Sequence, residues 1–184
     1  MSDFVCPWCF IGTRRLEQAL AGKEAEVAYR PFLLDPRIPA EGVDLRENLR
    51  KKFGRDPEGM FGRVEAAARE TGIPLDFAKV RRYPSTVHAH ALVRRTKDPR
   101  VLANALFEAY FLQGRDIGSP EVLAELAGGS AAVEESELEV VRQEAREASQ
   151  EGITGVPFFV FDGKIAVSGA QPQEVFRKAL SMHA

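Results

Sequence analysis

Two cysteines separated by two residues lie close to the start of the chain, in the motif Cys6-Pro7-Trp8-Cys9. They are the only cysteines among the 184 residues. A Cys-x-x-Cys pair can open and close as a disulfide, and in a reducing compartment the main uses of such a pair are catalysis and metal binding. We therefore predict that the chain exchanges electrons through Cys6 and Cys9.

The residues after the motif predict a helix that begins beside the first cysteine. Apolar side chains recur at helical spacing from Phe10 to Leu20, and Pro7 suits the first helical turn. The free N–H groups and the positive end of the helix dipole would favour a thiolate at Cys6. We predict Cys6 as the nucleophile and Cys9, one turn later on the same face, as the resolving thiol.

Two other uses of the cysteine pair stay open on the residues alone. The cysteines could be packed free thiols without a reaction. A zinc site would need two further ligands, and the candidates are His88, His90 and His183. His88 and His90 are two residues apart on a predicted helix and would not share a face, so we predict no metal and no resident cofactor.

Composition excludes several classes of partner. The 25 basic residues nearly balance the 27 acidic ones, so no overall field would attract nucleic acid or an anionic membrane. No stretch approaches the roughly 20 apolar residues of a membrane span. The five residues before Cys6 are too few for a secretory signal, and we expect a cytoplasmic protein.

The order of the predicted elements indicates the fold class. A strand at 26–30 follows the first helix, and helices punctuated by Pro and Gly continue to about residue 135. Cap-plus-proline pairs at Asp98-Pro99 and Ser119-Pro120, and a cap at Ser85, would open three of these helices. Next come a helix at 136–150, a hairpin turning at Asp162-Gly163 and a helix at 173–182.

We predict an α/β protein with the thioredoxin arrangement and an inserted all-helical domain. Residues 1–36 and 136–184 would form the discontinuous thioredoxin-like domain, and residues 37–135 the insertion. Val156-Pro157 stands at the head of the first hairpin strand, where an ordinary trans proline is favoured on the residues alone.

Four ordered segments resemble the DsbA-like thioredoxin-fold oxidoreductases of the FrnE type. They are residues 2–12, 29–36, 152–160 and 168–171. The resemblance implies that Cys6 attacks, that Cys9 resolves, and that a cis Pro157 faces the pair. It also implies that the Val156 backbone pairs with a substrate strand by β-augmentation.

The chain departs from that family in three places. The family has a β-strand before the Ser2-Asp3 element, so the first strand is apparently absent or truncated here. Ser85 and Ala91 stand where the family's Asn-Thr/Ser-x-x-Ala-His-Arg element has Asn and Arg. The related glutathione-dependent isomerases and kappa-class transferases typically have Ser at the position of Cys6, so the paired cysteines favour redox chemistry.

We therefore predict a thiol–disulfide oxidoreductase that uses the Cys-Pro-Trp-Cys pair on a disulfide- or dithiol-containing protein or small thiol. Glutathione is a candidate co-substrate, and a homodimer is an allowed assembly. One alternative is a glutathione-dependent isomerase or transferase with a small-molecule site between the two domains. A non-enzymatic chaperone is a third hypothesis. The direction of electron flow stays open.

Overall fold

The first helix fixes the position of the cysteine pair. The computed structural model describes residues 1–182. In it, α1 (Pro7–Leu20) begins directly after Cys6, which is its N-cap residue. Pro7 occupies the first turn, where its missing N–H leaves no bond unmade. The helix and the place of proline in it are as predicted.

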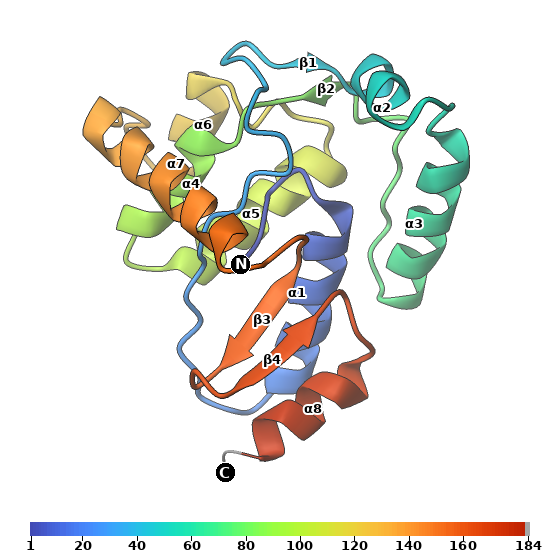
Figure 1. The fold of residues 1–184 in the computed structure, drawn as a ribbon, viewed down its shortest axis with the longest axis vertical. Coiled ribbons are helices and arrows are strands. Elements are labelled where there is room, and N and C mark those ends of the chain that lie inside the picture. Colours follow the sequence, from blue (N-terminus) through green and yellow to red (C-terminus); the bar gives the residue numbers. More distant parts are fainter. Residues whose placement is uncertain (183–184) are drawn as a thin grey trace.

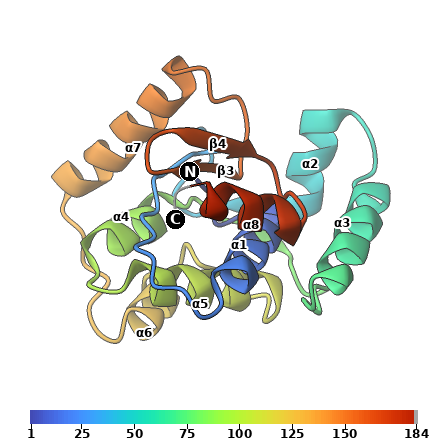
Figure 2. The same ribbon diagram turned by 90° about the horizontal axis from the view of Figure 1, so that it is seen from below.

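A β-hairpin near the end of the chain lies against this helix. β3 (Phe158–Phe161) and β4 (Ile165–Ser168) pair antiparallel, and Asp162 and Gly163 between them both have positive φ angles. A tight hairpin turn needs such angles, which explains the Asp-Gly signal in the sequence. The closing helix α8 (Gln173–Ser181) packs on α1 and on the hairpin (Figures 1 and 2).

The prediction of a regular strand at 26–30 is wrong. This segment runs as extended chain without a strand ladder, and one parallel bridge, Ser2 to Pro31, follows it. The exposure of the side chains still alternates, because Val27 and Tyr29 are half-buried while their neighbours are exposed. The alternating residues therefore have the pattern of a strand but no neighbouring strand alongside most of their length.

Helices make up most of the middle of the chain. Asp98 and Ser119 cap two of them through side-chain bonds to Val101 N and Val122 N, as predicted. Ser85 was the wrong cap, since Thr86 is the N-cap residue of its helix and makes no side-chain bond to it. The helices are α2 (Leu45–Phe53), α3 (Glu58–Glu70), α4 (Val87–Arg95), α5 (Pro99–Phe111), α6 (Pro120–Leu126) and α7 (Glu135–Gln150).

Two very short strands interrupt these helices, so the expectation of an all-helical segment at 37–135 is not met. β1 (Val43–Asp44) pairs antiparallel with β2 (Arg82–Tyr83). Each strand is two residues long, too short to produce the alternating pattern by which strands are recognised in a sequence. The small sheet joins the start of α2 to the loop before α4.

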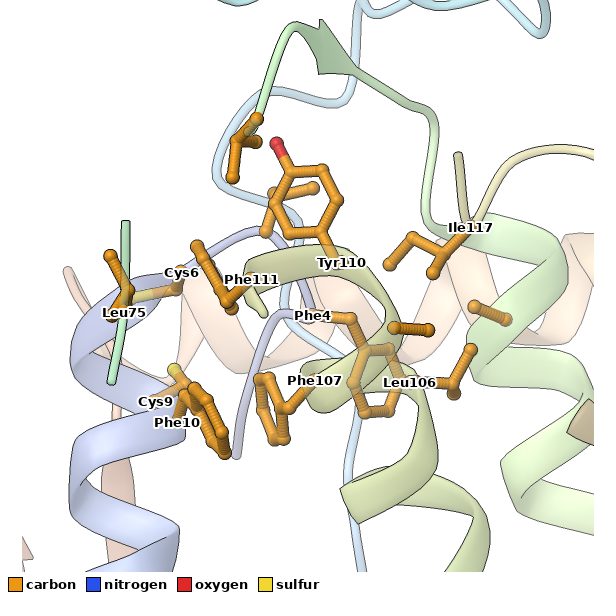
Figure 3. Close-up of a cluster of buried hydrophobic side chains, with 14 of the residues drawn as sticks. Phe4, Cys6, Cys9, Phe10, Leu75, Leu106, Phe107, Tyr110, Phe111 and Ile117 are labelled. Atoms are coloured by element: carbon orange, nitrogen blue, oxygen red, sulfur yellow. The ribbon is translucent and has the colours of Figure 1, made fainter. Parts of the chain in front are cut away.

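The main hydrophobic core includes both cysteines and reaches from α1 into the helical segment (Figure 3). Phe10 stacks on Phe107 and Phe111 of α5, with ring centroids 5.4 and 5.9 Å apart. The segments on either side of residue 37 therefore both contribute to this core, while a second apolar cluster lies between α1, β4 and α8. None of the helices within residues 1–182 is long and apolar enough to cross a membrane.

Candidate active site

The two thiols lie at the start of α1, below the protein surface. Both cysteines are free, with Cys6 4% exposed and Cys9 0% exposed. The Cys9 N–H donates to Cys6 O at 3.0 Å, which closes the first turn of the helix. This turn holds the two side chains on the same side of the helix, as their spacing predicts.

The residues between the cysteines form the exposed part of the motif. Trp8 is 39% exposed and Pro7 is half-buried. An exposed tryptophan beside a buried thiol presents an apolar, aromatic surface where a substrate would approach. Pro7 and Trp8 thus lie where the sequence predicts the active-site motif.

A loop about 150 residues away in the sequence faces the pair. Cys6 Sγ lies 3.7 Å from Val156 O, within reach of a weak S–H hydrogen bond. The Val156–Pro157 peptide bond is cis, the isomer that the family resemblance implies. The structure therefore brings together the four residues Cys6, Cys9, Val156 and Pro157.

A glycine in α1 allows this loop to approach closely. A Cβ atom at Gly12 would lie 2.9 Å from Pro157 Cγ and 3.1 Å from Phe159 Cζ, closer than side chains normally tolerate. Gly12 is buried in the helix interior, where glycine is unfavourable by roughly 1 kcal/mol relative to alanine. The close contact with the Pro157 loop gives a physical reason for glycine at this position.

The electrostatic environment of Cys6 differs from the sequence-based expectation. The hydrogen bond with the Cys9 side chain and, next, burial raise the pKa of the Cys6 thiol above its usual range. A backbone hydrogen bond from Cys9 acts in the opposite direction and is outweighed. The helix N-terminus therefore does not determine the pKa of Cys6. The expectation of a favoured thiolate at Cys6 is not met in this state of the protein.

A buried carboxylate lies directly before the motif, and the sequence analysis did not find it. Asp3 is 2% exposed and accepts hydrogen bonds from Leu34 N at 2.8 Å and from Thr86 Oγ1 at 2.7 Å. His90 Nε2 lies 3.7 Å from Asp3 Oδ1. Cys6 N in turn donates to Asp3 O at 3.0 Å, so this cluster holds the backbone that leads into the cysteine pair.

The signals for this cluster are present in the sequence but far apart. Asp3 belongs to the first segment of the family resemblance, and Thr86 and His90 belong to the element at 85–91. Their contact spans 83 residues, so the sequence spacing does not predict it. His88 lies on the same helix, His183 lies outside the described residues, and no metal-binding group of three His, Cys, Asp or Glu residues forms within 1–182.

Comparison with known proteins agrees with this geometry. A family model described as a DSBA-like thioredoxin domain matches residues 1–181. The chain belongs to this family. The DSBA-like assignment covers α1, the hairpin and all of the helices between them.

Relatives of this DSBA-like chain match nearly all of its length. The protein YwbO of Bacillus subtilis (strain 168) is 31% identical over 193 residues, which cover 98% of this chain and 93% of YwbO. The crystal structure of a probable DsbA oxidoreductase from Streptomyces coelicolor is 34% identical with a TM-score of 0.81. It matches over 98% of this chain and 86% of its own.

A 2-hydroxychromene-2-carboxylate isomerase structure is also similar, at 17% identity and a TM-score of 0.63. That match covers 98% of this chain and 91% of the isomerase and shows a shared fold. The DSBA-like fold thus occurs both in oxidoreductases and in an isomerase. The residues of the site must decide between the two activities.

Proposed function

We propose that this protein is a thiol–disulfide oxidoreductase in which Cys6 and Cys9 form the redox couple. The observation that carries the proposal is the position of Cys6 Sγ, 3.7 Å from Val156 O and one helical turn from a second thiol. A substrate disulfide held against the Val156 backbone would lie next to the attacking sulfur. Exposed Trp8 would border the same approach.

The reaction needs only these two sulfurs and the substrate. Cys6 loses its proton and attacks one sulfur of the substrate disulfide, which forms a mixed disulfide and releases the first substrate thiolate. Cys9 then loses its proton and attacks Cys6 Sγ, which releases the second substrate thiolate. The substrate has gained two electrons, the protein keeps the Cys6–Cys9 disulfide, and the two protons go to the released thiolates or to water.

The environment of Cys6 supports the reducing direction. A strong oxidant of this type has a reduced form that is stabilised as the thiolate. Here the hydrogen bond with Cys9 and burial raise the pKa of Cys6, so the thiolate has no such stabilisation. We infer a reduction potential nearer to the roughly −270 mV of thioredoxin than to the roughly −120 mV of a strong oxidant. This potential suits a reductase in the cytoplasm.

Turnover of insulin disulfides by the Cys6→Ser and Cys9→Ser variants tests the proposal. Cys6→Ser should abolish reduction, whereas Cys9→Ser should stop turnover but accumulate a mixed disulfide at Cys6, visible by mass spectrometry under non-reducing conditions. Unchanged insulin reduction by Cys6→Ser would overturn the proposed role of Cys6. A circular dichroism spectrum of each variant controls for folding.

The glutathione-dependent isomerase or transferase is the second candidate, favoured by the shared fold with 2-hydroxychromene-2-carboxylate isomerase. It requires glutathione to bind reversibly without a resolving thiol. Calorimetric titration of Cys9→Ala with S-methylglutathione, which cannot exchange disulfides, separates the two functions. Saturable binding favours the isomerase or transferase, and a flat titration favours the oxidoreductase.

A further inference from the structure

The turn that follows strand β4 holds the main chain of Pro157. Gly169 N donates to Pro157 O at 2.8 Å, one step beyond the ladder in which Ser168 pairs with Phe158. Proline has no N–H, so its carbonyl is the only group through which its own main chain can be hydrogen-bonded. The position of Pro157 relative to Cys6 therefore depends on where this turn lies.

The turn is short and bonded within itself. It comprises residues 168–171, and we call it the 168–171 turn. Gln171 N donates to Gly169 O at 2.9 Å, and the Gln171 side chain donates to Ser168 O at 2.9 Å. Gly169 has a φ angle of 82°, which favours glycine. Because these bonds fix the shape of the turn, a contact that holds one of its residues also holds the others.

Arg15 of α1 makes such a contact. Its Nη1 donates to Ala170 O at 2.7 Å, and its Nε donates to Thr71 Oγ1 at 2.9 Å. Thr71 is the buried C-cap residue of α3, and its hydroxyl donates to Ala67 O at 3.0 Å, which leaves the oxygen to accept from Arg15. Figures 1 and 2 show the 168–171 turn beside α1, on the side of α3. Arg15 thus joins the turn to both helices.

The partners of Arg15 indicate that it serves through its geometry rather than through charge pairing. Both of its acceptors are neutral oxygens, and it forms no ion pair within residues 1–182. The neighbouring Arg14, by contrast, pairs with Glu108 at 3.0 Å and with Glu17 at 3.9 Å. A guanidinium carries its donors on a rigid planar fork, so it can hold two segments at a fixed separation.

Gly12 and Arg15 are three residues apart on α1, so they lie on the same side of the helix. Gly12 leaves room for Pro157, and Arg15 holds the turn to which Pro157 is bonded. We propose that Arg15 is a positioning residue, which holds the 168–171 turn against α1 and so keeps the Val156–Pro157 loop in place for a protein substrate. This inference rests on the proposed oxidoreductase function.

A positioning role predicts different outcomes for two kinds of disulfide. A protein disulfide is held against the Val156 backbone, so a displaced loop slows its reaction. Hydroxyethyl disulfide is too small to pair as a strand and only has to reach Cys6. Loss of the Arg15 contacts should therefore slow the reaction with insulin and leave the reaction with hydroxyethyl disulfide no slower.

Hydrogen exchange by NMR and single-turnover oxidation of the reduced protein test the proposal in Arg15→Met. Exchange of the Gly169 amide should be at least about tenfold faster, because its bond to Pro157 O opens more often. Trp8 is the only tryptophan of the chain and lies between the two cysteines, so its fluorescence follows their oxidation. The rate constant with insulin should fall about tenfold, and that with hydroxyethyl disulfide should not fall.

Three further variants control this experiment. Arg14→Met removes the neighbouring arginine and its bond to Glu108, and should leave Gly169 exchange and both rate constants unchanged. Thr71→Val removes one acceptor of Arg15 with little change of shape, and should act in the same direction as Arg15→Met by a smaller factor. It keeps the test decisive if Arg15→Met does not fold. Thr71→Ser keeps the hydroxyl and should behave like the unaltered chain.

Two results would overturn the proposal. One is unchanged Gly169 exchange in both Arg15→Met and Thr71→Val. The other is an equal loss of rate with insulin and with hydroxyethyl disulfide, which would give Arg15 a purely structural role. If the unaltered chain were oxidised by neither disulfide, the proposed oxidoreductase function would fail instead, and the Gly169 exchange rates would still show whether Arg15 holds the turn.

Discussion

Replacing Gly12 with alanine should separate the active-site contact from ordinary helix stability. In an open helix position Gly→Ala stabilises by roughly 0.5–1 kcal/mol. At Gly12 the added methyl group would lie 2.9 Å from Pro157 Cγ and 3.1 Å from Phe159 Cζ. Overpacking of this kind typically costs about 1–3 kcal/mol. Gly12→Ala should therefore lower the free energy of unfolding by up to about 2 kcal/mol.

Gly62→Ala is the matched control, because Gly62 lies in the interior of α3 with no atom of another residue near its potential Cβ. It should raise the free energy of unfolding by about 0.5–1 kcal/mol in urea denaturation. Gly12→Ala should also displace the Val156–Pro157 loop from Cys6 and slow insulin reduction about tenfold or more. If both variants were stabilised equally with unchanged activity, the close contact between α1 and the loop would be refuted.

Three further outcomes follow from the buried charged and titratable groups. Asp3→Ala removes the acceptor for Leu34 N and Thr86 Oγ1, and should cost about 2–5 kcal/mol in urea unfolding; a loss below about 1 kcal/mol would contradict the buried cluster. The Met1 amine has a pKa of about 6 when folded and about 8 when unfolded, so the unfolded chain binds the extra proton between these values. Stability should then rise by about 2 kcal/mol from pH 6 to pH 8, and N-terminal acetylation should flatten this rise. Because the pKa of Cys6 is raised, its alkylation by iodoacetamide should keep accelerating up to pH 9 in the Cys9→Ser background as well, where burial and the Asp3 charge still raise the pKa; a plateau below pH 7 would show an activated thiolate instead.

The parts of the fold with local signals were predictable from the sequence. α1 follows from the helical spacing after Cys6, and the hairpin follows from Asp162-Gly163 between two apolar runs. Both signals arise from residues that are neighbours in the chain. The segment at 26–30 has equally good alternation, yet a strand also needs a partner, and its partner is not encoded within the segment.

The residues of the candidate site could be named from the sequence, but the electrostatic environment of Cys6 could not. Cys6 and Cys9 were found from spacing, and Val156 and Pro157 from the family resemblance. The direction in which the pKa of Cys6 shifts depends on how deeply the thiol is buried and on its hydrogen bond with Cys9. Neither can be read from the position of Cys6 at the start of a helix. The contact of Asp3 with Thr86 depends on the packing of α4 against the start of the chain, and no local pattern indicates it.

The most direct test of the proposed function is a redox titration of the Cys6–Cys9 pair. The protein is equilibrated in dithiothreitol buffers of graded potential, quenched with acid, alkylated and weighed by mass spectrometry. We predict one two-electron transition between the dithiol and an intramolecular disulfide, with a midpoint below about −200 mV. If both thiols stayed free for alkylation across the whole range, Cys6 and Cys9 would not be a redox couple and the proposed function would be wrong.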